Sequence, residues 1–274
     1  MCIIIKGDKM KRFLKGIAVG VGGIAPGLSG SVMLVIFGLY EKTVEAIGTI
    51  FKDLKKNILF LVPLFMGFGV GILAFSKVVD YFLKSFELYT RFVFFGLVLG
   101  TIPLFYKEVK KKDFKNKNYF IIAGAFLLGI LLFTFNKNLF PTVTNPNLFQ
   151  SIVLGFSVAC STIIPGVDSA TILSAFGLYE LYVESVANLD LNILIPAGVG
   201  LGLGALIVSY FINKIIKKYY SITFSVIFGL FLSIIPSVLN ENCTLAMNLE
   251  SLIALILCIL GFIVSYFFGK LKKE

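Results

Sequence analysis

Histidine is absent from this chain of 274 residues. The sequence therefore lacks the commonest general base, the Ser-His-Asp triad and most kinds of zinc site. The four cysteines are scattered and show neither metal-ligand nor redox spacing, so they are interpreted as small apolar residues. These absences exclude the usual enzyme classes, and the sequence predicts a protein without catalytic residues, metal or cofactor.

Charge is also scarce. Only 15% of the residues are charged and 58% are hydrophobic, whereas a soluble domain carries roughly a quarter charged residues. Several apolar runs approach the roughly 20 helical residues that cross a hydrocarbon core about 30 Å thick. The net charge of +10 would suggest nucleic-acid binding in a soluble protein. Here the basic residues cluster in short loops between apolar runs, as in the cytoplasmic loops of membrane proteins. The sequence predicts an all-α integral membrane protein that binds no nucleic acid.

The chain contains two copies of one unit. A shift of 139 positions superposes Pro26-Gly27 on Pro165-Gly166, and Phe37–Glu41 on Phe176–Glu180. A second block repeats with a shift of 133, which pairs Pro63, Gly67, Gly69 and Gly71 with Pro196, Gly200, Gly202 and Gly204. Matched prolines and glycines in order are unlikely to arise from apolar composition alone. The sequence therefore predicts two related halves, residues 1–136 and 137–274.

Each half is predicted to hold one unusual segment followed by three membrane spans. The unusual segments are residues 13–40 and 151–180. The predicted spans are residues 58–75, 91–106 and 119–135 in the first half, and 193–212, 222–239 and 252–268 in the second. Three crossings in a half would turn the second copy upside down, as in the inverted repeats of transporters.

A Pro-Gly pair interrupts each unusual segment. Each resulting piece has about 13 residues, or about 20 Å of helix, which is too short to cross. The segment is either one broken span or a re-entrant hairpin of two half-helices. If both segments are hairpins, 21 of the 25 basic residues lie on one face of the membrane. If each segment crosses once, 15 basic residues lie on one face and 10 on the other. The positive-inside rule favours hairpins that enter from opposite sides, in a prokaryotic plasma membrane with both termini cytoplasmic.

An amphipathic helix is expected between the first hairpin and the first span. Val44, Ile47, Phe51, Leu54 and Ile58 recur at helical spacing, opposite a set of charged residues. Such a pattern is typical of a helix lying on the membrane surface.

The hairpin tips are predicted to bind an anion. Non-helical backbone at membrane depth must be surrounded by protein or water, and the first N–H groups of a half-helix are free donors at the positive end of its dipole. Two such ends meeting near the midplane would form an anion site. Alternatively, Ser29 and Asp168 are only helix caps. The candidate ligand-binding residues at the tips are Pro26, Gly27, Ser29, Gly30, Ser31, Pro165, Gly166, Asp168, Ser169 and Thr171.

At these motifs the chain resembles the PopT-type polyprenyl-phosphate transporters, domain-of-unknown-function family 368. The resemblance covers nearly the whole chain and depends on residues 26–30, 38–40 and 95–97, on Pro103 and on the weaker second copy at Pro165-Gly166. It implies the return of undecaprenyl phosphate, the carrier lipid of cell-wall assembly, to the cytoplasmic leaflet. The hairpins alone indicate only an anionic ligand.

The second tip departs from the pattern that the resemblance leads us to expect. Asp168-Ser169 stands where a serine and a glycine are expected, as in Ser29-Gly30. A carboxylate would repel a phosphate, so Asp168 is either protonated, or paired with a coupling cation, or off the phosphate. An acid inside a membrane is a functional candidate by default, so Asp168 is the favoured coupling residue.

Three further charged residues are candidates. Glu41 and Glu180 follow Gly-Leu-Tyr at the predicted C-terminal end of a half-helix, where a negative charge opposes the dipole. They are either held in the headgroup zone by lysines, or bound to a tertiary partner, or part of a proton-linked gate. Arg91, at the outer end of a span, either receives incoming phosphate or extends to the interface.

The leading hypothesis is therefore a carrier that moves a phosphate headgroup past the tips while the polyprenyl tail stays in lipid. Transport would be coupled to a proton or Na⁺. A carrier or channel for a small soluble anion would suit the hairpins equally well, and an enzyme acting on lipid phosphates is disfavoured by the missing histidine. The sequence leaves the oligomeric state open, and an oligomer is compatible with it.

Overall fold

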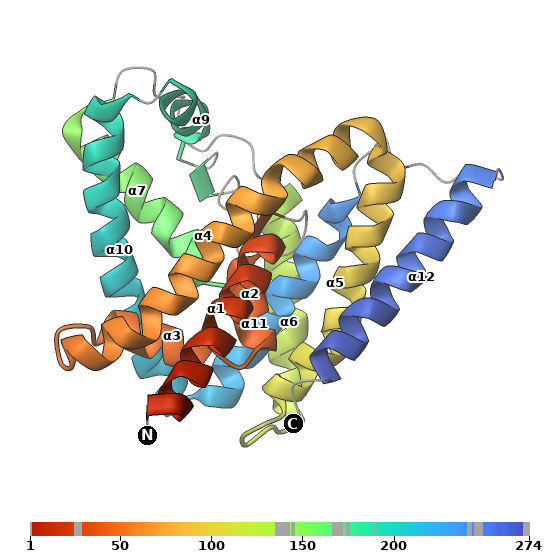
Figure 1. Ribbon diagram of the computed structural model, residues 1–274, viewed down its shortest axis with the longest axis horizontal. Helices are drawn as coiled ribbons and strands as arrows, with labels where there is room; N and C mark the ends of the chain where they lie inside the picture. The colour runs from red at the N-terminus through yellow and green to blue at the C-terminus, as the bar shows by residue number, and fades with distance from the viewer. Residues whose placement is uncertain are drawn as a thin grey trace. The chain divides into compact units, whose positions relative to one another are not determined.

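The structure is a computed structural model, and it describes residues 2–24, 29–134, 143, 146–165, 172–173, 176–188, 190–239, 243 and 249–270. All elements in these residues are helices (Figure 1). Four helices are long and apolar enough to cross a membrane: α4 (Leu54–Ser85), α5 (Glu87–Val109), α10 (Leu191–Lys218) and α12 (Leu249–Lys270). The predicted class, an all-α membrane protein, is confirmed.

Helices contain four of the six predicted spans completely and the other two up to their last residue. Four of them fall in α4, α5, α10 and α12. The other two fall in α6 (Lys117–Thr134) and in α11 (Tyr220–Ile234), whose apolar stretches are shorter than 18 residues. A short 3₁₀ helix, η1 (Ile235–Val238), continues α11.

Two predicted spans differ in length from the helices that contain them. α4 has 32 residues and continues ten residues past Phe75, through Lys77 and Lys84. The hydropathy pattern marks where the apolar stretch ends, whereas charged residues can continue the helix beyond it. The span predicted at residues 222–239 changes instead to 3₁₀ geometry at Ile235, where Pro236 lacks the N–H that an α-helix needs.

The arms of the first predicted hairpin also differ from expectation. The first arm, α1 (Cys2–Ile24), begins well before Phe13 and has 23 residues. The second arm, α2 (Gly30–Ile36), has only seven. α2 packs back against the last turns of α1, since a methyl group on Gly30 would lie 3.5 Å from Val19 Cγ1. Charged residues fill the first part of α1, so only its final turns are apolar enough to accompany α2 into a membrane.

A left-handed glycine stands shortly before a new helix in both halves. Gly38 and Gly177 have φ angles of 60° and 67°, which glycine adopts without steric cost. The following N–H bonds back across the turn, from Leu39 to Leu34 and from Leu178 to Leu173, both at 2.8 Å. Nine-residue helices follow directly, α3 (Tyr40–Gly48) and α9 (Tyr179–Ala187).

The continuous amphipathic helix expected through Ile58 is wrong. α3 ends at Gly48, a turn occupies residues 49–53, and Phe51 is 82% exposed. Gly48 is a weak helix former, and the Thr49 hydroxyl donates to the Glu45 carbonyl oxygen at 2.7 Å.

The chain forms two compact units that do not coincide with the two sequence halves. Unit 1 comprises Met1–Thr43, Leu54–Phe114 and Ile234–Glu274, and unit 2 comprises Val44–Asp53 and Lys115–Ser233. Unit 1 thus takes its last long helix, α12, from the second half of the sequence, and unit 2 takes α6 from the first.

In unit 1, glycines let α1 and α4 approach until their backbones touch. A methyl group on Gly16 of α1 would overlap the Leu64 carbonyl oxygen of α4. Conversely, a methyl group on Gly67 of α4 would overlap the Phe13 carbonyl oxygen of α1. Such small-residue contacts are typical of helix pairs in membranes.

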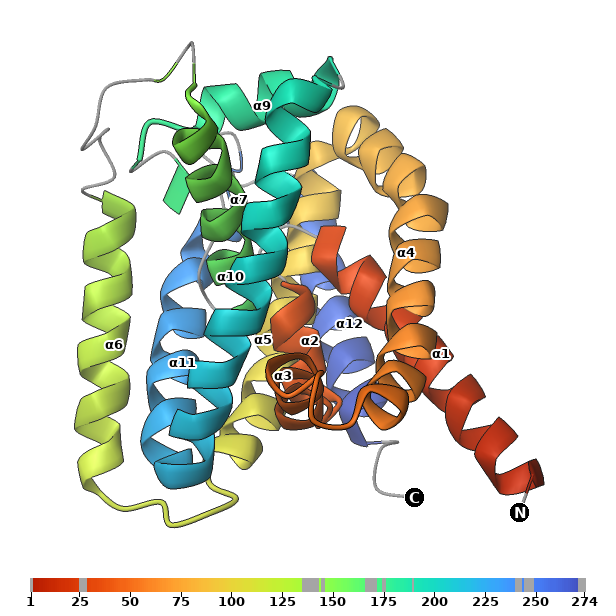
Figure 2. The same cartoon turned by 90° about the vertical axis from the view of Figure 1, so that its left-hand side faces the viewer.

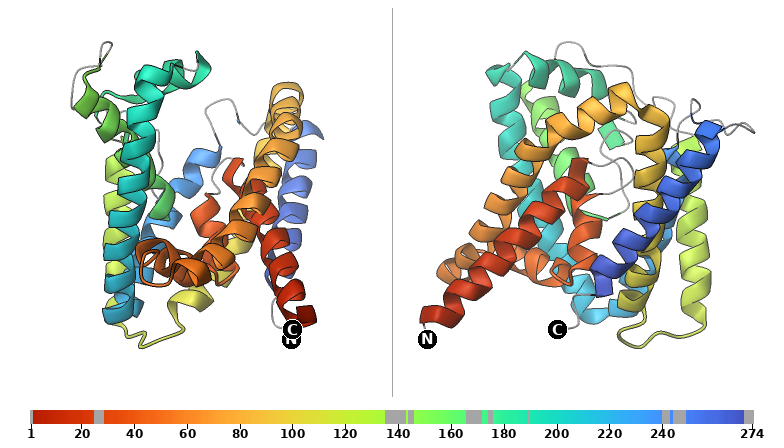
Figure 3. Two further views of the ribbon diagram at one scale, coloured as in Figure 1. Left: turned by 60° about the vertical axis from the view of Figure 1, so that its left-hand side comes forward. Right: turned by 45° about the vertical axis from the view of Figure 1, so that its right-hand side comes forward.

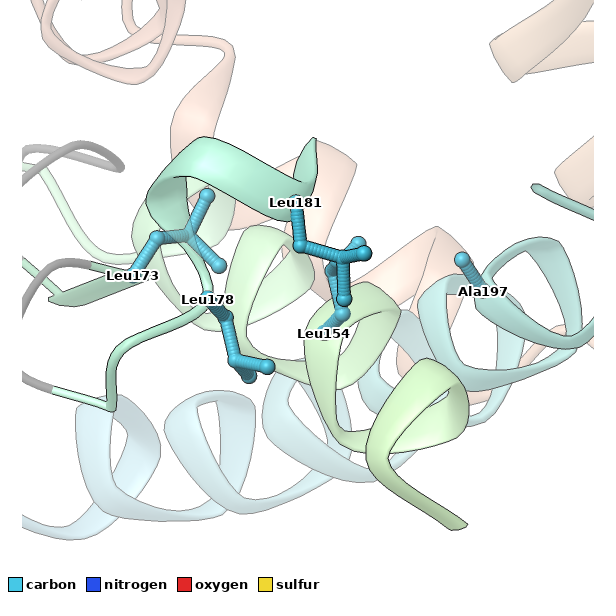
Figure 4. Close-up of a cluster of buried hydrophobic side chains, with 5 residues drawn as sticks. All are labelled: Leu154, Leu173, Leu178, Leu181 and Ala197. Atoms are coloured by element: carbon cyan, nitrogen blue, oxygen red, sulfur yellow. The ribbon is translucent and has the colours of Figure 1, made fainter. Parts of the chain in front are cut away.

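Unit 2 contains the same contacts at the equivalent positions, between α7 (Leu148–Ile163) and α10. A methyl group on Gly155 would overlap the Ala197 carbonyl oxygen, and a methyl group on Gly200 would overlap the Ile152 carbonyl oxygen. These four residues are the first-unit residues shifted by 139 in α7 and by 133 in α10. Four buried leucines and one alanine connect α7, α9 and α10 (Figure 4): Leu154, Leu173, Leu178, Leu181 and Ala197.

The remaining long helices pair in the same manner. In unit 1, Gly96 of α5 lies against the Cys258 carbonyl of α12 (Figure 1). In unit 2, Gly229 of α11, the residue equivalent to Gly96, lies against the Ile122 carbonyl of α6 (Figure 2). Each unit therefore contains one glycine-packed pair from its own half and one pair that includes a helix of the other half.

The glycines of α10 allow a test with controls on the same helix. Gly200→Ala should destabilise the protein by about 1–3 kcal/mol, because its methyl group has no room beside α7. The methyl groups added by Gly198→Ala and Gly202→Ala would lie in open space, so both substitutions should be neutral or stabilising. The fraction that remains monodisperse after heating in detergent measures the difference. Equal heat resistance of all three variants would contradict the glycine contact.

Candidate functional site

Three candidate residues come together where α2 begins. Ser29 has extended backbone (φ −108°, ψ 150°), and its Oγ accepts a hydrogen bond from the Val32 N–H at 3.2 Å. The hydroxyls of Ser29 and Ser31 lie 3.0 Å apart, and Ser31 is buried. Gly30 leaves room for the Phe68 ring of α4, 3.3 Å from where a methyl group would be. Ser29 is thus a helix cap inside a packed bundle.

The other tip residues are placed only in part. Pro165 is buried in the turn that follows α7. Pro26, Gly27, Gly166, Asp168, Ser169 and Thr171 lie outside the described residues. Whether the two tips meet at one anion site therefore stays a prediction.

Glu41 and Glu180 do not lie at the end of a half-helix, as the sequence had suggested. Each stands in the first turn of a new helix, α3 or α9, because the chain turns at Gly38 and Gly177. A negative charge there is favourable to the helix dipole. The opposition between charge and dipole, which had pointed to a special role for both glutamates, is therefore absent.

Glu41 has basic neighbours in the loop after α5. Its carboxylate lies 3.8 Å from Lys111 Nζ and 3.9 Å from Lys112 Nζ. Burial tends to lower the pKa of Lys111, but its hydrogen bond to Glu108 and the charges of Glu108 and Glu41 raise that pKa above its usual range. These contacts fit the interpretation in which lysines hold Glu41 in the headgroup zone.

Arg91 ties α5 to η1 within unit 1. Its Nε donates to Glu87 Oε1 at 2.9 Å, and its Nη1 donates to the Val238 carbonyl oxygen at 3.1 Å. Two of its five N–H donors are therefore used within the protein. A role in receiving phosphate stays a prediction.

Two groups of buried polar residues escaped the sequence analysis. In the first, Asn118 of α6 donates to Ser221 Oγ and Ser225 Oγ of α11, at 2.5 and 3.0 Å. In the second, Ser209 and Asn213 are buried on α10 one helical turn apart. The signal was present as polar residues spaced by four within an apolar run, but their burial depends on the neighbouring helices.

Among the described residues, no group of three or more histidine, cysteine, aspartate or glutamate side chains is placed to hold a metal ion. The polar groups at the start of α2 are hydroxyls and backbone N–H donors, which suit an oxyanion rather than a cation.

Apolar spans, glycine-packed helix pairs and a capped half-helix folded back on α1 define the class: a polytopic α-helical membrane protein. Residues 48–256 match the VCA0040-like family model, described as undecaprenyl phosphate translocase-like, and the chain belongs to that family.

Two curated relatives extend the match to nearly the whole chain. A protein of Vibrio cholerae serotype O1 named polyprenyl-phosphate transporter is 26% identical over 256 residues, covering 88% of this chain and 81% of its own. A Staphylococcus aureus protein of the same name is 27% identical over 280 residues, covering 97% of this chain and 98% of its own. No solved structure matches the chain significantly.

Ser29 can be tested by separating its capping role from a ligand role. Ser29→Asp keeps a capping oxygen, whereas Ser29→Ala removes it and should cost the fold about 0.5–2 kcal/mol. If Ser29 also contacts phosphate, the Asp variant should fold normally and yet transport poorly, because its charge repels the ligand. Thermal stability and lipid-phosphate transport measured together decide this. An Asp variant that transports at the wild-type rate would leave Ser29 as a cap only.

Proposed function

We propose that this protein is a transporter that returns undecaprenyl phosphate, or a related polyprenyl phosphate, across the cytoplasmic membrane. The family match over residues 48–256 carries the proposal, together with relatives named as polyprenyl-phosphate transporters. The described structure is compatible with it, because the hydroxyls of Ser29 and Ser31 lie together at the start of α2. The protein acts as a carrier and catalyses no covalent step.

The physical problem is to move a charged headgroup through a medium that excludes charge. A phosphate monoester carries about −1.5 to −2 charges at neutral pH, and an uncompensated ion in hydrocarbon is too costly to carry. Helix N-termini and hydroxyls at the two tips would replace the water around the phosphate. The polyprenyl tail is as apolar as the lipid and can remain there throughout.

The two halves are proposed to insert in opposite orientations. The equivalent glycine contacts of α1 with α4 and of α7 with α10 support a common fold for both halves. The basic residues supply the orientation, since re-entrant hairpins put 21 of 25 on one face. On this proposal both termini are cytoplasmic, and one hairpin opens toward each side.

Single-cysteine labelling tests this topology at four exposed positions at helix ends or between helices. After replacement of the native cysteines, Asn116→Cys and Tyr219→Cys should react from the cytoplasmic face. Ser85→Cys and Asn188→Cys should react from the opposite face. If each Pro-Gly segment crossed once, Asn116 would instead label with Asn188, and Tyr219 with Ser85.

Transport itself is tested in liposomes that contain the purified protein and a labelled polyprenyl phosphate. We expect the protein to accelerate movement of the phosphate lipid between leaflets, with long-chain polyprenyl phosphate competing better than inorganic phosphate. Competition by inorganic phosphate alone would favour a carrier of small anions. Release of free phosphate would indicate an enzyme.

Asp168 is the proposed coupling residue, since a bound proton or Na⁺ would offset part of the phosphate charge. In the same liposomes, Asp168→Asn keeps the size and a capping oxygen but cannot ionise. It should bind lipid phosphate and lose the dependence of transport on a pH or Na⁺ gradient. An unchanged gradient dependence would reduce Asp168 to a helix cap and make Glu41 and Glu180 the next candidates.

A further inference from the structure

Three polar side chains follow one face of α10 at intervals of one turn: Ser209, Asn213 and Lys217. We call these three residues the polar row. Their exposure falls along the helix, from 60% for the Lys217 side chain to 8% for Asn213 and 0% for Ser209. At 1.5 Å per residue the row extends about 12 Å along α10 from its charged end. Polar groups thus continue from the surface end of a membrane span into its buried part.

The end of α3 lies against α10, and both belong to unit 2 (Figure 3, left). A methyl group on Gly48 would lie 2.6 Å from the Tyr210 nitrogen and 2.8 Å from the Ser209 carbonyl carbon, so the two backbones touch there. One turn earlier on α3, Glu45 forms an ion pair with Lys217. The ion pair lies at the exposed end of the row.

Ser209 is the residue that packing alone does not explain. Its hydroxyl is fully buried and has no hydrogen-bond partner in the part of the chain that the structure describes. Other buried serines of the same unit donate to their own helix, as Ser185 does to the Leu181 carbonyl oxygen at 2.6 Å and Ser225 to Ser221. An unsatisfied buried hydroxyl is costly and calls for a partner, such as a polar ligand that visits the site.

The same pattern occurs in the first half of the sequence. Shifting the row back by 133 positions gives Ser76, Asp80 and Lys84 in α4, with aspartate in place of asparagine as the only change. If the halves insert in opposite orientations, the charged ends of the two rows reach opposite faces of the membrane.

We infer that the polar row of α10 is the path by which the phosphate headgroup passes between the membrane interior and the face where α10 ends. This inference rests on the proposed function and names a part of its route. The Ser209 hydroxyl, the Asn213 amide and the Lys217 ammonium group are all donors to phosphate oxygens. The phosphate carries more charge than a carboxylate and displaces Glu45 from Lys217 on its way.

The buried end of the row is tested with Ser209→Ala and Asn213→Leu in the liposome assay, with undecaprenyl phosphate as the probe. Each variant should transport roughly tenfold more slowly, because each removes a hydrogen bond to a charged group. Ser209→Ala should not lower thermal stability, since it removes an unsatisfied hydroxyl. The matched control is Ser185→Ala, which removes a buried hydroxyl outside the row and should transport normally.

The charged end is tested by the concentration dependence of transport. Lys217→Gln should raise the half-saturating lipid concentration, whereas Glu45→Gln should lower it, because the phosphate then meets no competing carboxylate. A merely structural ion pair would shift both variants in the same direction.

The outcomes distinguish the proposed function from the proposed role of the polar row. Wild-type protein that moves no polyprenyl phosphate overturns the proposed function. Wild-type protein that transports, with Ser209→Ala and Asn213→Leu equal to it, overturns the polar row alone.

Discussion

The contact on which the structure depends is backbone against backbone at glycine. In water, two apolar helices associate because they exclude solvent, but in a membrane the lipid tails are as apolar as the helices. Stability must then come from close packing, and glycine permits the closest approach. α1 against α4 and α7 against α10 use the same four positions for this purpose. Rigid pairs of this kind can hold a seven-residue helix such as α2 in place, which would not be stable alone.

The same constraint explains where irregular backbone occurs. Peptide groups cannot be left unsatisfied in hydrocarbon. The end of α2 is therefore closed by the left-handed Gly38 and its reverse hydrogen bonds, and its start is capped by Ser29. Arg91 satisfies the end of η1 in the same way, because it donates a hydrogen bond to the Val238 carbonyl oxygen. Polar side chains such as Ser29 and Arg91 thus satisfy backbone hydrogen-bonding groups, whereas the buried Ser209 hydroxyl does not.

The sequence predicted the helical class, the location of six apolar helices and the equivalence of Gly38 with Gly177, because apolar length and paired glycines are local properties. It missed the true length of α1 and α4, since a helix continues past the apolar stretch that reveals it. It placed Glu41 and Glu180 at the wrong helix end, since a left-handed turn at one glycine decides which helix a neighbouring residue joins. The cap at Ser29 was recognised from its motif, and a ligand role for Ser29 stays a prediction. The burial of Ser209 was not recognised, because it depends on where α3 ends.

The exchange of the last long helices affects how the chain is made. α5 leaves the ribosome early, but its partner α12 is the last long helix of the chain. Until α12 arrives, Gly96 lacks the Cys258 carbonyl against which it packs. A chain that stops before Leu249 could not complete unit 1, however well its first half had inserted. Synthesis of the whole chain is therefore a condition for assembly of its first part, and truncated products would be open to quality-control proteolysis.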